Sequence, residues 1–153
     1  MNIATNARSQ AVTTLLNGTL SSLKNVVPIH FTTKKPHLQE RDFRLTFGVL
    51  IGFTGDIKGK LVFSGNLHTF GAIGKQMFGS SLESEMLLSF SGELGNMIAG
   101  GLSTNMADKG VCVNITSPTL MHGDTTLSGY KQALKVPIVF DNVGGMDIYL
   151  LLD

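Results

Sequence analysis

The sequence predicts an α/β protein of the α+β type, with long helices packed on a mostly antiparallel sheet in one domain spanning residues 1–153. Two long segments carry apolar residues at spacings of three and four, as amphipathic helices do. The other apolar segments are short, rich in β-branched and aromatic residues, and separated by turn residues, as in hairpins. No linker, low-complexity tract or charge run divides the chain, and its length suffices to bury a sizeable core.

The chain begins with a predicted helix followed by a hairpin. Apolar residues recur at helical spacing across residues 9–26, and Pro28 ends this helix because proline cannot continue it. Residues 45–53 and 57–63 are rich in β-branched and aromatic residues and are expected to be antiparallel strands. The Thr-Gly-Asp segment between them supplies the turn.

Two further helices are predicted in the middle of the chain. Asn66 is a favourable N-cap for a short helix that runs to Met77. Ser80 and Glu83 fit a capping box at the start of a long helix, and Gly110 fits its C-terminal stop. The apolar positions that define the buried side of the long helix are Leu87, Phe90, Leu94, Ile98 and Leu102.

The last third of the chain is predicted to complete the sheet. Residues 111–120 form a β-rich run that we expect to be one strand. Residues 133–141 and 146–152 are expected to form a closing hairpin around an Asn-Val-Gly-Gly turn. Pro137 lies in the first of these strands, and its missing N–H favours an edge strand or a bulge there.

Composition argues against several functions. The net charge is +1, from 12 basic and 11 acidic residues, so no nucleic-acid partner is expected. No apolar run approaches the roughly 18 residues of a membrane span, and no secretory signal is recognisable, so we expect a cytoplasmic protein without membrane insertion. Cys112 is the sole cysteine and the four histidines are scattered, which argues against a disulfide or a metal site. With only 15% charged residues, a partner or a second copy is expected to cover apolar surface.

The long helix carries one carboxylate and one amide, Glu93 and Asn96, on the side opposite its apolar residues. At about 100° per residue, these two share a face with small residues only. An ordinary solvated face carries Lys, Glu, Gln or Arg, and each glycine costs a helix about 1 kcal/mol relative to alanine. We therefore expect this face to receive the backbone of another protein. The small residues that form the expected docking face are Ser89, Gly92, Gly100 and Ser103.

The glycines also permit a purely structural interpretation. The Glu-x-x-Asn spacing taken alone is weak, and Gly100-Gly101 is compatible with close helix–helix packing. This holds above all for Gly101, which lies on the apolar arc of the helix.

Three segments resemble one family. "GELGNMIAGGLSTNM" resembles the signature helix of the CheC/CheX/FliY group of chemotaxis phosphatases. "GVLIGFTGDIKGKLVFS" resembles the Gly-Phe-x-Gly-Asp-x-x-Gly hairpin of that group, and "SPTLMHG" the segment that follows its signature helix. Together these pieces span roughly residues 10 to 152 and imply a CheC/CheX-like fold.

The resemblance implies hydrolysis of the aspartyl phosphate on a CheY-like response regulator. It implies that Glu93 pairs with a lysine of the regulator's active site, while the amide of Asn96 orients the attacking water. The Mg²⁺ ion would be held by the regulator, so no cofactor is expected in this chain. These residue types suit the chemistry, because phosphoryl transfer asks mainly for positioning and an amide both donates and accepts without becoming charged.

The sequence departs from the family pattern at several positions. CheC-like members carry a motif on each of two helices, but Thr14 stands where the first helix would need glutamate, although Asn17 matches. The chain is therefore identified as CheX-like, with one site, and the resemblance implies a homodimer formed by strand exchange. Gly95 replaces the commoner alanine and Gly101 a common asparagine, and both are expected to loosen the helix.

Two other functions stay open at this point. A non-catalytic module that binds response regulators, like the motif-lacking middle domains of flagellar switch proteins, would bind a regulator without accelerating dephosphorylation. A signalling module with a groove for a small ligand is the other alternative, and only the glycine content supports it.

Overall fold

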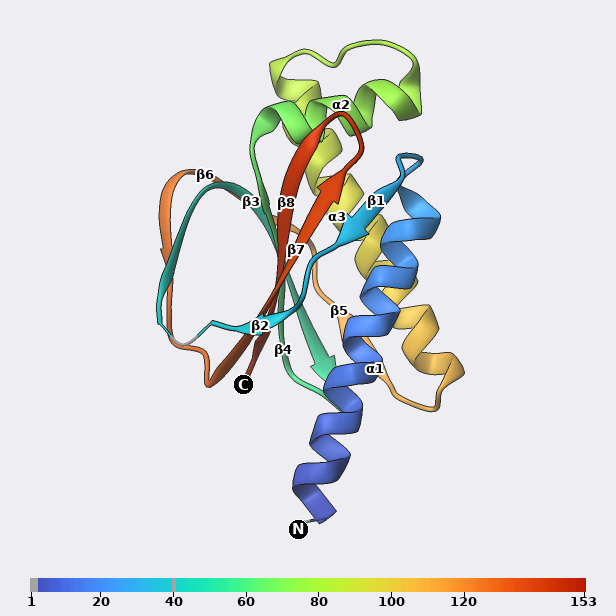
Figure 1. The fold of residues 1–153 in the computed structure, drawn as a ribbon, viewed down its shortest axis with the longest axis vertical. Coiled ribbons are helices and arrows are strands. Elements are labelled where there is room, and N and C mark those ends of the chain that lie inside the picture. The colour runs from blue at the N-terminus through green and yellow to red at the C-terminus, as the bar shows by residue number, and fades with distance from the viewer. Residues whose placement is uncertain (1–2, 40) are drawn as a thin grey trace.

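The computed structural model describes residues 3–39 and 41–153, which form an eight-stranded sheet with helices α1 and α3 side by side on one face (Figure 1). The strand order is β1-β7-β8-β4-β3-β5, and every recorded pairing is antiparallel, so the expected α+β architecture is confirmed. β2 also pairs with β7, and β6 with β3. The elements are α1 Ile3–Val26, β1 Phe31–Thr33, β2 His37–Leu38, β3 Phe43–Gly55, β4 Gly59–Gly65, α2 Leu67–Phe78, α3 Ser84–Asp108, β5 Val113–Ile115, β6 Thr119–Leu127, β7 Gln132–Phe140 and β8 Gly144–Leu152.

α1 ends at Val26 as predicted but begins at Ile3, six residues before the predicted start, and the other helix ends follow the predictions except at the start of α3. Asn66 caps α2, its Oδ1 accepting from the backbone N–H of Thr69 at 2.8 Å. Gly110, at φ +78°, follows the last turn of α3, and its N–H donates to Ala107 at 2.9 Å. The capping box of Ser80 and Glu83 was wrong, because α3 begins one residue after Glu83, which occupies the N-cap without a side-chain hydrogen bond.

The connection between α2 and α3 explains that exception. Leu82 turns toward the core, where it packs so close to α2 that a Cβ on Gly74 would lie 2.7 Å from its Cδ1. Burial of Leu82 therefore sets the path of the connection and delays the start of α3 beyond the serines. Packing outweighs the local capping preference here.

α1 and α3 pack in close contact through small residues. A Cβ on Gly101 would collide with Oγ and Cβ of Ser22, so the two backbones approach closely at this point. The buried Ser22 hydroxyl donates to the carbonyl of Ile98 at 2.7 Å, and Asn105 Nδ2 donates to the carbonyl of Gly18 at 3.0 Å. The structural interpretation of Gly101 is thus confirmed, and this glycine fits the helix to its neighbour.

The β3–β4 hairpin forms as predicted, but the run over residues 111–120 is not one strand. β5 and β6 pair with successive parts of β3, and residues 116–118 separate them. Pro118 has no N–H for a ladder. At Thr116 the backbone N–H still donates to the carbonyl of Gly52 at 2.8 Å, but it is the side-chain Oγ1 that accepts from the N–H of Gly52 at 2.9 Å. A side chain thus takes over part of the backbone pairing at the break.

The closing hairpin of β7 and β8 also forms as predicted, with Asn142 at φ 61° in its turn. Pro137 was wrongly expected at an edge or a bulge, because β7 pairs with β8 on one side and with β1 and β2 on the other. The carbonyl of Pro137 accepts from Lys34 N at 2.9 Å, between those two short strands. In an antiparallel strand the N–H and C=O of one residue point to the same side, so the N–H that Pro137 lacks would also face the break between β1 and β2. No ladder hydrogen bond is therefore lost there.

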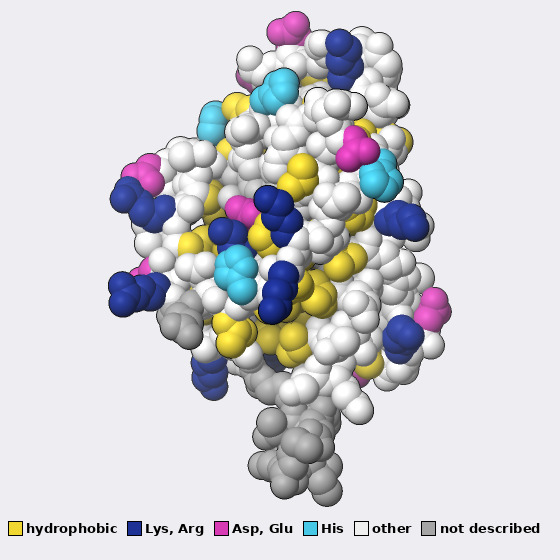
Figure 2. Space-filling view, viewed as in Figure 1, with side chains coloured by type: hydrophobic (Ala, Val, Ile, Leu, Met, Phe, Trp, Pro, Cys, Tyr) yellow, Lys and Arg dark blue, Asp and Glu magenta, His cyan; other side chains and the backbone are white. Residues whose placement is uncertain are grey.

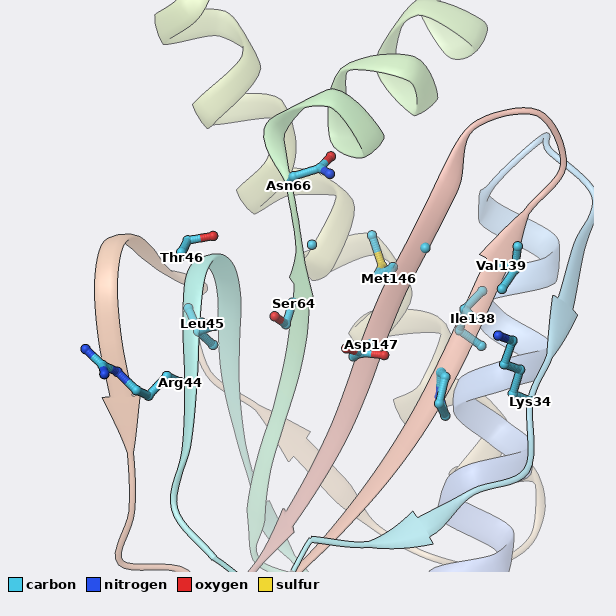
Figure 3. A pocket seen from close by; sticks show the side chains of 13 residues that line it. Lys34, Arg44, Leu45, Thr46, Ser64, Asn66, Ile138, Val139, Met146 and Asp147 are labelled. Carbon is cyan, nitrogen blue, oxygen red and sulfur yellow. The ribbon is translucent and has the colours of Figure 1, made fainter.

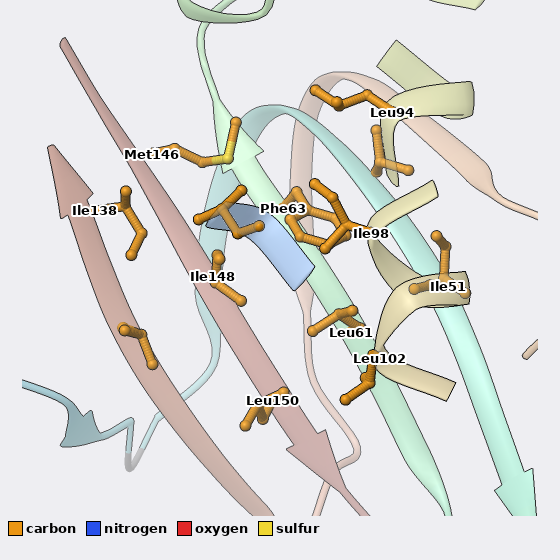
Figure 4. Packing of buried hydrophobic residues seen from close by; sticks show 14 of the residues in the cluster. Ile51, Leu61, Phe63, Leu94, Ile98, Leu102, Ile138, Met146, Ile148 and Leu150 are labelled. Carbon is orange, nitrogen blue, oxygen red and sulfur yellow. The ribbon is translucent and has the colours of Figure 1, made fainter. Parts of the chain in front are cut away.

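The two faces of the sheet carry cores of different size. The larger core lies between the sheet and the helices, where α3 contributes Leu94, Ile98 and Leu102 (Figure 4). On the other face β3 and β6 curve over the sheet (Figure 1), and the ring of Phe43 stacks on Tyr149 of β8 at a centroid distance of 3.9 Å. The register of β3 and β6 shifts between residues 45 and 47, where this curve lies.

Within the described part of the chain, no helix has the length and apolar character needed to span a bilayer.

We expect Gly101→Ala to lower the free energy of unfolding by about 1–3 kcal/mol, because the new methyl group collides with Ser22. Gly100→Ala is the matched control: apart from its own turn of helix, no atom lies within 4 Å of its Cβ position. Alanine there should stabilise the helix by up to about 1 kcal/mol. Urea unfolding of both variants measures the difference, and effects of the same sign would contradict the packing role.

Burial raises the pKa of Tyr149 to about 12 from its ordinary value of 10.0, with further increments from Asp147 and Tyr130. The folded protein therefore favours the neutral phenol, and this stability is present below pH 10 and lost as pH rises through 12. Tyr149→Phe keeps the ring on Phe43 and should lose less stability over that interval. Urea unfolding at about pH 8 and about pH 11 compares the two proteins, and identical losses would contradict the assignment.

Candidate functional site

Glu93 and Asn96 lie one turn apart on the outer side of α3. The carboxylate of Glu93 is exposed and the amide of Asn96 is half-buried. Within residues 3–39 and 41–153, neither side chain forms a hydrogen bond or an ion pair with another group of the chain. Both polar groups are therefore available to a partner, and their spacing of three places them on one face.

The backbone beneath this pair is held close to the sheet. Gly95 is buried, and a Cβ at this position would lie 2.8 Å from Cγ1 of Val49 on β3. Glycine here allows α3 to approach β3 more closely than alanine would. Gly95 and Gly101 were expected to loosen the helix, but the structure gives each a packing role.

The expected docking face is narrower in the structure than in the sequence pattern. Ser89 is exposed, and Gly100 faces open space. Gly92 is buried, with Pro118 and Leu120 on its outer side, and the Ser103 hydroxyl donates to the carbonyl of Val113 at 2.6 Å. Gly92 and Ser103 therefore face residues 113–120 of the same chain. The sequence pattern predicted a strand there and did not indicate that it packs against α3.

Large apolar side chains surround the pair, and the sequence reasoning missed most of them. Of the five large hydrophobic side chains exposed in the described chain, four lie on α3 or on the elements beside it, and the fifth is Leu38 on β2. Met86 lies seven residues before Glu93 and Met97 four residues after it, so helical spacing places both beside the face of the pair. The four are Phe78, Met86, Met97 and Leu120.

A hollow with polar lining lies over β3, β4, β7 and β8, apart from this pair (Figure 3). Lys34 and Arg44 stand on opposite sides of it, and Asp147 lies between them. Arg44 is paired with Asp124, and Lys135 lies 3.8 Å from Asp147. On the face shown in Figure 2, basic side chains are likewise interspersed with acidic ones.

The described residues contain no cluster of three or more His, Cys, Asp or Glu side chains that could hold a metal ion. His30 instead pairs with Asp141, with 3.0 Å between Nδ1 and the carboxylate.

Comparison with known proteins identifies the family. Residues 47–141, which include α3, match the family model described as chemotaxis phosphatase CheX. The chain is also 30% identical over 147 residues to the CheY-P phosphatase CheX of Thermotoga maritima, covering 93% of this chain and 95% of that protein. The chain belongs to the CheX family. The resemblance seen in its motifs is thereby confirmed.

Solved structures share the CheX fold. The chemotaxis protein CheX from Desulfovibrio desulfuricans superposes with a TM-score of 0.79 at 18% identity, covering 94% of this chain and 99% of that one. A chain of the CheX–CheY–BeF3–Mg²⁺ complex from Borrelia burgdorferi gives 0.76 at 20% identity, with coverages of 92% and 96%.

We expect Gly95→Ala to destabilise this CheX-family chain by about 1–3 kcal/mol, because its methyl group would press on Val49. Helix propensity alone predicts the opposite sign. The cost should shrink in a Val49→Ala background, which a double-mutant cycle of urea unfolding measures. An equal cost in both backgrounds would show that the contact with β3 is irrelevant.

Proposed function

We propose that this chain hydrolyses the aspartyl phosphate of a CheY-like response regulator, with Asn96 orienting the attacking water and Glu93 pairing with a regulator lysine. The observation that carries the proposal is the pair itself, which projects from α3 without a hydrogen-bond or ion-pair partner among the described residues. Membership of the CheX family supports it, as does the 30% identity to a CheY-P phosphatase.

The amide of Asn96 suits the task of positioning water. Its oxygen accepts from the water and its NH₂ group donates to a phosphoryl oxygen, and neither role requires a charge. Phosphoryl transfer depends mainly on alignment and charge complementarity. A hundredfold acceleration corresponds to about 2.7 kcal/mol, which two well-placed hydrogen bonds can supply.

The carboxylate of Glu93 acts as an anchor in this proposal. It lies on the same face as Asn96, so a lysine bound to it fixes the distance between the amide and the phosphoryl group. The Mg²⁺ ion belongs to the regulator, and this chain contributes no metal ligand. The cytoplasmic location and the homodimer expected from the sequence stay predictions within the same proposal.

We expect the wild-type protein to accelerate phosphate loss from a phosphorylated CheY-like receiver domain by about a hundredfold, and Asn96→Ala to abolish this acceleration. Glu93→Ala should chiefly raise KM, because it removes the anchor rather than the amide. Asn17→Ala on α1 is the matched control, since it deletes an exposed helical asparagine that lacks a neighbouring glutamate. Phosphate release with a fluorescent sensor gives both constants.

An Asn96→Ala variant that retains the full acceleration would overturn the mechanism. A wild-type protein that binds the phosphorylated receiver without accelerating phosphate loss would instead establish the non-catalytic binding module.

A further inference from the structure

An open apolar groove adjoins the proposed catalytic pair. It runs between the C-terminal end of α2 and the first half of α3, and its volume is about 680 Å³. The side chains of Phe78 and Met86 form its walls and are 63% and 62% exposed. The full lining is Phe78, Ser80, Leu82, Glu85, Met86, Ser89, Phe90 and Glu93.

The groove is preformed. Phe90 is buried at its base, and the ring of Phe78 meets it edge-on at a centroid distance of 5.7 Å. Gly79, at φ +80°, ends α2 directly after Phe78, and Leu82 anchors the connection in the core. The walls thus stand on fixed elements, although their outer surfaces remain in water.

The groove and the catalytic pair form one continuous surface. Met86, Ser89 and Glu93 follow one another at spacings of three and four along α3, and Glu93 belongs to both features. Seven residues separate Met86 from Glu93, which is about 10 Å along a helix. The other half of the helix presents Met97, which is less exposed at 39%, and then Gly100 and Ser103, which offer no large side chain for a partner to cover.

Geometry decides what occupies the groove once a regulator is docked. A stable interface covers about 800 Å² per partner, equivalent to a disc with a radius of roughly 16 Å. A receiver domain of this footprint centred on Glu93 and Asn96 reaches Met86, about 10 Å from Glu93 along the helix, and Phe78, which lines the same groove as Glu93. Exposed aromatic and methionine side chains are the types enriched at the centre of such interfaces.

We propose that this groove receives an apolar side chain of the regulator from beside its phosphorylated aspartate, together with a basic neighbour that faces Glu85. The inference rests on the proposed function. It extends that function by assigning Phe78, Met86 and Glu85 to the choice of regulator, while Asn96 retains the chemistry. The footprint of the regulator thus extends from the pair toward α2.

The test uses the full chain with a CheY-like receiver domain, phosphorylated for turnover and loaded with BeF3⁻ and Mg²⁺ for binding. Phe78→Ser and Met86→Ser should each raise KM and Kd about tenfold and leave kcat within about twofold. Phe78→Leu should restore most of the affinity, and Glu85→Lys should weaken binding in a salt-dependent way. Leu38→Ser on β2 is the control, because it removes a side chain that is 57% exposed and lies outside the groove.

Unchanged KM and Kd in both serine variants would overturn the inference, as would a loss of kcat alone. Light scattering of the same variants tests self-association: a change of oligomeric state at constant KM would assign the groove to a second copy. If the wild-type protein binds the receiver without hydrolysing its phosphate, the proposed function fails. The Kd values of the serine variants then show by themselves whether the groove binds the regulator.

Discussion

The wedging of α3 between α1 and β3 is the constraint on which the site depends. Gly101 lets α3 approach α1, and Gly95 lets it approach β3, so two sides of one helix, about 120° apart around its axis, are fixed by close contact. A helix held in this way has little freedom to roll or slide, because packed interiors do not deform continuously. The outward direction of Glu93 and Asn96 is therefore set by residues that never touch a partner.

This arrangement divides the proposed chemistry between two proteins. The pair has no supporting hydrogen bonds of its own in the described structure, so its order must come from the helix backbone beneath it. In the proposal the regulator supplies the metal, the lysine and the phosphoryl group. A rigid scaffold is then the main contribution of this chain, because the entropy lost on docking is smaller when the donor groups are already in place.

Several features could be predicted from the sequence because they depend on local periodicity. The apolar spacing of the two long helices and the turn residues of both hairpins reflect burial patterns that neighbouring residues determine. The exposed pair of Glu93 and Asn96 could also be predicted, because a lone carboxylate and amide among small residues differ from an ordinary solvated helix face. The failures involve distant contacts. Gly92 is covered by Pro118, Leu82 displaces the capping box, and β1 and β2 hide the edge of β7, and no local pattern encodes these meetings.

The order of the elements along the chain bears on how the protein folds. Ser22 and Ile98, which join α1 to α3, are 76 residues apart, and β8 follows every other described strand although it lies in the interior of the sheet. Such non-local pairings slow folding, because long loops must close before their contacts stabilise anything. During synthesis the apolar side of α1 stays uncovered until α3 has been made. The strands on either side of β8, β7 and β4, cannot join into one sheet before β8 has been made. Exposed apolar surface of this kind makes a partly synthesised chain prone to aggregation.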